Sequence, residues 1–252
     1  MAISGTYTFN PDVSELVEEA YERAGLELRS GYDLRTARRS LNFLMIEWQN
    51  RGINLWTIEQ KTISETSAGD SLTTNYLNQS TASYNIDTGT ISLLDLILRI
   101  NDGVVATQAD YHLNRIAQPT YANIPNKLTE GRPLQYYFDR KEILDTGAGT
   151  NQNSTITLWP IPDENSKYKI LYWRIARIAD TGNLASNTMQ VPDRFLPALV
   201  AGLAYQVATK RPEVASRVPF LKEQYDELFT QAADEDRVKT SARFVPRAAT
   251  YR

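Results

Sequence analysis

The chain has 252 residues, which allows one large domain or two small ones. It has no cysteine and a single histidine, so disulfides, thiolate metal sites and multi-histidine metal sites are excluded. The net charge of −3 is unevenly distributed, because residues 237–252 carry five basic residues and no acid, while the remaining 22 basic and 30 acidic residues leave −8. No apolar run is long enough to span a membrane and the start lacks a secretory-signal pattern, so we expect no membrane partner.

A first amphipathic helix is predicted over residues 10–25. Asn10 can cap its start and Pro11 suits the first helical position. Gly25 is a plausible stop. The apolar residues follow helical spacing and form one stripe: Val13, Leu16, Val17, Ala20 and Ala24.

A second helix is predicted from about residue 33 to residue 51, with Asp33 as its cap and Gly52 after its end. The short link to the first helix predicts an antiparallel pair. Its expected buried stripe is Leu34, Ala37, Leu41, Leu44, Met45 and Trp48. Three arginines lie away from that stripe: Arg35, Arg38 and Arg39.

The pattern changes to short strands from Trp56 to about residue 178. Between residues 93 and 100 the residues alternate. This predicts one face with Leu94, Leu96, Leu98 and Ile100 and an opposite face with Leu93, Asp95, Ile97 and Arg99. Further strands are predicted at 136–138, 155–159 and 167–178. The polar segments 64–90 and 144–154 are expected to be long loops, and residues 110–118 a short helix capped by Asp110.

Two more helices are expected towards the C-terminus. One starts at residue 193 and ends at Arg211–Pro212, and the other has Pro219 in its first turn. The fold class predicted is therefore α+β. It comprises an antiparallel helical bundle (1–55 and 190–238), an inserted β-sandwich or small barrel subdomain (56–189), and an extended C-terminal arm (239–252).

Motifs for chemistry are weak. His112 has no acid or nucleophile placed beside it by any motif, so we expect an ordinary surface histidine. The glycines of Asp145–Asn151 precede a strand rather than a helix, which excludes a dinucleotide fingerprint. The acidic clusters at 163–165 and 234–236 lack calcium-loop spacing. We expect no enzyme, no metal and no cofactor.

The arginines of the second helix allow two interpretations. Arg35, Arg38 and Arg39 could contact DNA phosphates. They could instead form ion pairs, within or between subunits, with acidic residues such as Glu18, Glu19, Glu22 and Glu27 of the first helix. The net acidic body favours the ion pairs, because DNA binding needs a net basic field.

Three segments carry a more specific signal when taken in order. They are ARRSLNFLMIEWQNRGINLW (37–56), LWPIPDENSKYKILYWR (158–174) and VPDRFLPALVAGLAYQVATKRPE (191–213). Together they resemble the head-to-tail connector, or adaptor, proteins of short-tailed bacteriophages, the tail tubular protein A-like family. The segments are packing signatures and contain no catalytic motif.

The resemblance implies a structural virion protein, assembled in the host cytoplasm and located in the neck between capsid and tail. It implies a homo-oligomeric ring of about twelve copies between the portal protein and the tail nozzle protein. Double-stranded DNA would pass through the ring's channel without sequence-specific binding. The alternatives are another neck or stopper virion protein, and a duplex-DNA-binding protein.

The C-terminal arm is the predicted binding element for the portal or a neighbouring subunit. Its basic charge complements the acidic body, and Pro246 suits an extended strap. The residues expected to make the contact are Arg243, Phe244, Val245, Pro246, Arg247, Tyr251 and Arg252.

Overall fold

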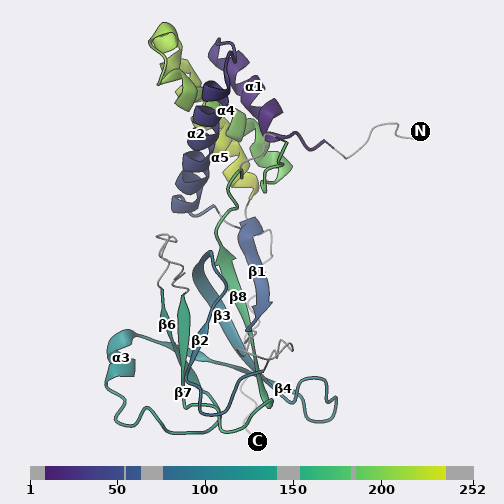
Figure 1. The fold of residues 1–252 in the computed structure, drawn as a ribbon, viewed down its shortest axis with the longest axis vertical. Coiled ribbons are helices and arrows are strands. Elements are labelled where there is room, and N and C mark those ends of the chain that lie inside the picture. Colours follow the sequence, from purple (N-terminus) through teal and green to yellow (C-terminus); the bar gives the residue numbers. More distant parts are fainter. Residues whose placement is uncertain (1–8, 54, 64–75, 141–153, 183–185, 237–252) are drawn as a thin grey trace, which may run out of the picture. The chain divides into compact units, whose positions relative to one another are not determined.

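A computed structural model describes residues 9–53, 55–63, 76–140, 154–182 and 186–236. The described part is mixed α+β, with five α-helices and two four-stranded sheets (Figure 1). The chain divides into two compact units, one of Met1–Ile53 with Ala179–Arg252 and one of Asn54–Ile178.

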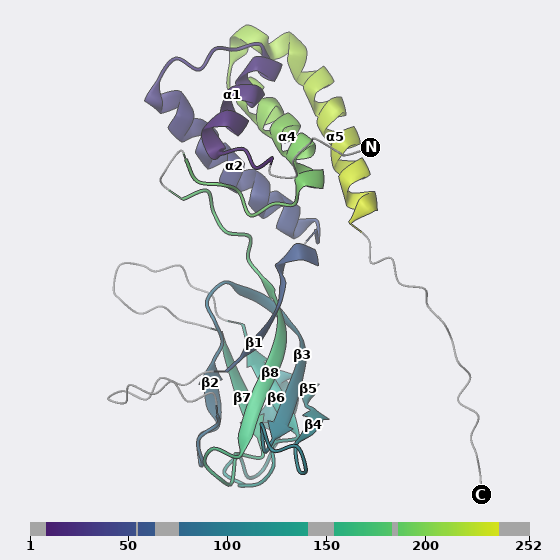
Figure 2. The same ribbon diagram turned by 90° about the vertical axis from the view of Figure 1, so that its right-hand side faces the viewer.

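The helical unit is arranged around α4 (Leu196–Ala208). This helix packs against α1 (Val13–Ala24), α2 (Gly31–Asn50) and α5 (Val218–Glu235), as Figure 2 shows. α4 is apolar on almost all sides, and ten of its 13 residues are accordingly buried. Two short 3₁₀ turns, η2 (Asp193–Phe195) and η3 (Pro212–Arg217), precede α4 and α5.

The helix starts differ from the sequence prediction. Asp12, not Asn10, caps α1, and its side chain forms a capping box with Glu15. Ser30, not Asp33, caps α2. Asp33 instead lies buried in the first turn and pairs with Arg211. The predicted stop at Gly25 is confirmed, because this glycine adopts the left-handed conformation with φ of 77°.

Gly202 marks the closest approach of three helices. A Cβ at this position would lie 2.8 Å from Cε2 of Tyr225 on α5 and 2.9 Å from Cδ2 of Leu44 on α2. Gly202→Val should therefore lower the free energy of unfolding by about 1–3 kcal/mol through overpacking. Urea unfolding followed by helical circular dichroism at 222 nm measures this.

Gly31 provides the matched control. It lies in the first turn of α2, and a Cβ there would meet no atom within 4 Å. Gly31→Ala should be neutral or stabilising by up to about 1 kcal/mol. Equal effects of the two substitutions would contradict the tight crossing at Gly202.

The β unit holds two sheets. The first has the order β1-β8-β3-β4, and the second has the order β2-β7-β6-β5. Their bounds are Ile58–Thr62 (β1), Tyr168–Ala176 (β8), Thr90–Ile100 (β3), Ala109–His112 (β4), Ser83–Asn85 (β2), Thr155–Trp159 (β7), Gln135–Asp139 (β6) and Asn114–Ile116 (β5). The pairing is antiparallel except between β5 and β6. Buried side chains of both sheets form one core, including Leu96, Ile156 and Tyr172.

The separate sheets decide between the two predicted forms of this unit. A small closed barrel is wrong, because among the described residues no strand pairs the first sheet with the second. The second sheet contains β2, which lies in the segment 64–90 that the sequence predicts to be a loop. Of that predicted loop, residues 64–75 lie outside the described residues, as do residues 144–153 of the other.

The short helix predicted at 110–118 is also wrong. Those residues form β4 and β5, and the helix α3 (Gln118–Ala122) follows them. Asp110 is not a cap but the strand partner of Arg99, whose Nε and Nη2 each donate to its carboxylate at 2.8 Å. This hydrogen bonding lowers the pKa of the Asp110 carboxyl below its ordinary value.

The predicted alternation in β3 holds for only part of the strand. Leu96 and Leu98 are buried as expected, but Leu93 is buried and Leu94 is exposed. A register shift against β8 between Leu93 and Asp95 reverses the phase. A bulge of this kind depends on the partner strand, so a single strand's pattern does not reveal it.

Candidate functional site

The three arginines singled out in the sequence all lie on α2, but they do not form one group. Arg35 and Arg39 are exposed, whereas Arg38 is half-buried. Arg38 donates to the backbone oxygen of Gly182, and its neighbour one turn on, Asn42, accepts from the backbone N–H of Thr181 at 3.1 Å. Arg38 and Asn42 therefore help to hold the chain at Thr181 and Gly182 against α2.

The remaining two arginines belong to an exposed stripe that we call the outer α2 face. Its residues follow helical spacing of three or four: Tyr32, Arg35, Arg39, Phe43 and Ile46. Tyr32 and Phe43 are 66% and 60% exposed, large values for aromatic side chains. Such a mixture of apolar and basic residues on one helix face is typical of a protein-binding surface.

Lys210 extends the positive charge beside this face. Its Nζ contacts Oγ of Ser40 on α2. Burial lowers the pKa of Lys210 from its ordinary value, and the positive charge of Arg39 lowers it further. The next residue, Arg211, pairs with Asp33. Arg39 and Lys210 thus form a small basic edge on the helical unit.

The acidic residues Glu19 of α1 and Glu27, just after α1, do not neutralise this edge. Glu19 pairs with Arg23 of its own helix at 2.8 Å, and Glu27 pairs with Arg29 at 3.3 Å. Among the described residues, no ion pair joins Arg35 or Arg39 to an acid. Ion pairs of these arginines with acids of another subunit stay a prediction.

The C-terminal arm predicted to bind partners, Arg243, Phe244, Val245, Pro246, Arg247, Tyr251 and Arg252, lies outside the described residues. Its point of departure is described. α5 ends at Glu235, and the carboxylate of Asp236 pairs with Arg194 in η2. Asp236, the last described residue before the arm, therefore lies beside the N-terminal end of α4.

The residues considered for chemistry have ordinary structural surroundings. His112 lies on β4 with its side chain 72% exposed, and its Nδ1 lies 3.3 Å from a carboxylate oxygen of Asp95. Asp163 accepts a hydrogen bond from the Tyr168 hydroxyl at 2.7 Å. Glu164 pairs with Lys167, also at 2.7 Å. Within the described ranges, no three His, Cys, Asp or Glu side chains are grouped to hold a metal ion.

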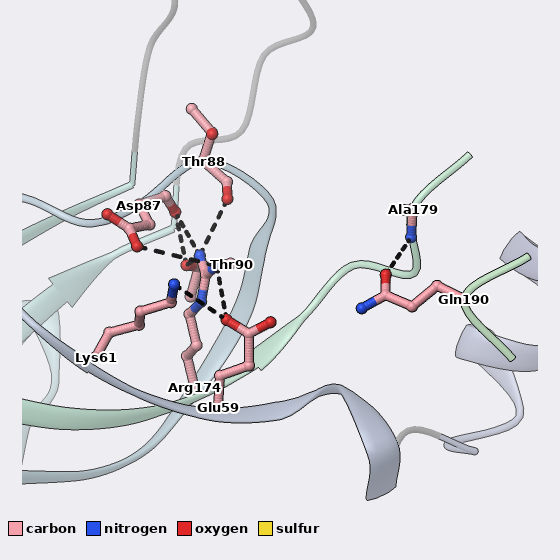
Figure 3. A network of polar contacts seen from close by, with 8 residues as sticks. All are labelled: Glu59, Lys61, Asp87, Thr88, Thr90, Arg174, Ala179 and Gln190. Carbon is pink, nitrogen blue, oxygen red and sulfur yellow. Dashed lines mark hydrogen bonds and ion pairs between the residues drawn. The ribbon is translucent and has the colours of Figure 1, made fainter. Parts of the chain in front are cut away.

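A buried arginine was missed in the sequence. Arg174, on β8, is only 8% exposed. Its Nη1 donates to the backbone oxygens of Asp87 and Thr88 and to Oγ1 of Thr90, and its Nη2 donates to Glu59 (Figure 3). These hydrogen bonds join β8 to Glu59 on β1 and to Thr90 at the start of β3. The arginine therefore has a structural role in the first sheet.

A family model described as SU10 adaptor protein matches residues 11–249. The matched range contains all three segments on which the sequence resemblance rests, and it confirms that resemblance. No curated protein matches the chain. In the part of the chain that the structure describes, no helix is long and apolar enough to cross a membrane. The chain belongs to the SU10 adaptor protein family, a family of phage head-to-tail adaptors, and is thus a structural protein of the phage neck.

Proposed function

We propose that this protein forms a ring of about twelve copies that joins the portal protein at the capsid vertex to the tail nozzle. In that ring the helices act as an antiparallel bundle, and the channel passes double-stranded DNA. The family match over residues 11–249 is the observation that carries the proposal.

The outer α2 face is the contact between neighbouring copies in this proposal. A ring needs two different surfaces per subunit that fit each other. Phe43 and Ile46 supply an apolar anchor, and Arg35 and Arg39 select an acidic surface on the next copy. Arg38 is not part of the contact, because it is engaged with Gly182.

The charge of the body suits a channel for DNA. Each phosphate neutralised by Lys or Arg strengthens DNA binding, so a channel wall that must release DNA should be poor in free basic residues. Residues 1–236 carry a net charge of −8. Such a ring would repel DNA weakly and hold no particular sequence.

Electron microscopy of the protein mixed with its portal tests the proposal. We expect closed rings seated on the portal. Phe43→Asp should abolish ring formation, because it places a charge in the centre of the subunit contact. Leu94→Asp is the matched control, since Leu94 is a similarly exposed apolar residue on β3, and it should leave rings intact.

The two possible failures have different meanings. Rings formed equally well by Phe43→Asp would remove the outer α2 face as the contact. A wild-type chain that stays monomeric on mixing with portal would remove the ring itself. Duplex-DNA binding that is tight at low salt and falls steeply with added salt would favour the DNA-binding alternative.

A further inference from the structure

An apolar groove runs between α1 and the start of α4. Its volume is about 490 Å³, within the range of pockets that bind a ligand or an anchoring side chain. The apolar lining comes from both helices and from the segment before α1: Phe9, Pro11, Leu16, Leu196, Pro197 and Val200. Phe9 is 75% exposed, so it stands at the mouth of the groove with most of its ring in solvent.

The rim of this groove is acidic. Glu15 and Glu19 come from α1, and Asp193 comes from η2. The one basic lining residue, Arg23, is already paired with Glu19 at 2.8 Å. The rim therefore keeps a net negative charge around an apolar floor. A ligand that fits must be basic and must carry apolar side chains.

We propose that this groove binds the C-terminal arm, residues 239–252, of a neighbouring copy. The arm has four basic residues and no acid, and it carries the apolar residues Phe244, Val245 and Tyr251. An aromatic residue placed in the groove and arginines placed on the rim satisfy both features of the site. Pro246 favours the extended backbone that an open groove accepts.

The length of the arm favours the groove of a neighbouring copy over its own. Asp236 pairs with Arg194, and Arg194 is the chain neighbour of the rim residue Asp193. The described chain thus ends, just after α5, close to its own groove. The 16 residues that follow Asp236 span on the order of 55 Å when extended, far more than a contact so near requires. Such a length suits a reach to the next subunit.

This inference rests on the proposed ring, because an arm in a neighbour's groove is a contact between two different surfaces and closes a ring when repeated. What the inference adds to the proposed ring is the site on each subunit that receives the arm of its neighbour. It is also independent of the outer α2 face, since the groove residues come from α1, η2, α4 and the segment before α1.

A fluorescein-labelled peptide of residues 239–252 tests the site. Fluorescence anisotropy with the full chain at nanomolar concentration should show binding that weakens as salt is raised. The double substitution Glu19→Lys and Asp193→Lys should weaken peptide binding by about tenfold or more, because two attractions become repulsions.

The matched control reverses two other exposed acids of α1, Glu18→Lys and Glu22→Lys. These residues change the net charge equally but do not line the groove. Peptide affinity should change less than about threefold. The difference between the two double variants then distinguishes direct contact of the peptide with the rim from attraction to the net charge of the protein. Circular dichroism checks that both variants keep their helices.

The origin of the bound arm is tested by a full-chain variant with a disabled arm, Phe244→Asp with Tyr251→Asp. Equal peptide binding by this variant and by the wild-type chain is expected, because the wild-type groove is empty in a monomer. Binding by the variant alone would show that each groove holds its own arm and would overturn the proposal.

No binding to either chain would overturn the groove as the receiving site. Rings that form on portal without any peptide binding would leave the proposed function standing and remove this inference alone. Peptide binding without rings on portal would leave the groove as the receiving site of the arm and would remove the proposed ring.

Discussion

Trp48→Ala should lower the free energy of unfolding of the helical unit by about 3–5 kcal/mol. Trp48 is fully buried on α2. Its ring centroid lies 5.4 Å from that of Phe195 and 5.8 Å from that of Phe229, so truncation empties the centre of this aromatic group. Urea unfolding followed at 222 nm measures the loss.

The polar side of Trp48 adds to the effect. Its Nε1 donates to the Tyr225 hydroxyl at 3.0 Å, and that hydroxyl lies 3.4 Å from a carboxylate oxygen of Glu47. Burial raises the pKa of Tyr225 to about 12, so the hydroxyl stays protonated at neutral pH. Tyr225→Phe leaves the indole N–H without its acceptor and should cost about 1–3 kcal/mol.

Phe43→Ala is the control for Trp48→Ala. Phe43 lies on the same helix, but 60% of it is exposed, so its truncation should change stability by less than about 0.5 kcal/mol. A comparable loss from both substitutions would mean that α2 is not buried along the face that carries Trp48.

The sequence predicts the helices well because their buried stripes are local patterns. The expected stripe of α2 is buried from Ala37 to Trp48, and Leu34 is half-buried. The helix caps are less predictable, since Asn10 and Asp12 are both good capping residues and the choice depends on the chain that precedes them. Asp33 was misplaced because its partner Arg211 is far away in the sequence.

The β unit is harder to predict, because its form depends on which strands pair. Leu113 is the single residue between β4 of the first sheet and β5 of the second, and its side chain is buried. Nothing local marks this residue as the point where the chain changes sheets. A separate pair of sheets and a closed barrel therefore give the same strand pattern.

The candidate surfaces were only partly predictable. The sequence indicates Arg35 and Arg39 by their charge. Phe43 and Ile46 fall outside the predicted buried stripe, but the stripe alone does not show how far they are exposed. An apolar residue is ordinarily assigned to the core, and only the packing of α4 against the other side of α2 shows otherwise. The groove lies between segments more than 150 residues apart and has no sequence signal.

Arg174→Met should destabilise the β unit by about 1–3 kcal/mol, because it removes the buried guanidinium on which several hydrogen-bond acceptors converge. Arg174 faces Glu59 across β1 and β8 in register, and its Nη2 lies 3.2 Å from the Glu59 carboxylate. Removing the guanidinium leaves the backbone oxygens of Asp87 and Thr88 without this donor, and it leaves Lys61, at 3.6 Å, as the ion-pair partner of the Glu59 carboxylate. Arg174→Lys keeps the charge but cannot span all these acceptors, so it should also destabilise, by less.

A second substitution separates the cost of the lost pair from the loss of packing. Arg174→Met combined with Glu59→Met should be more stable than Arg174→Met alone, because the half-buried Glu59 carboxylate that lost its guanidinium partner is then removed as well. Arg177→Met, an exposed site just after β8, should have little effect. Tryptophan fluorescence during urea unfolding reports mainly on this unit, since it holds Trp56, Trp159 and Trp173. A double variant less stable than the single one would show that Glu59 stabilises the sheet without Arg174.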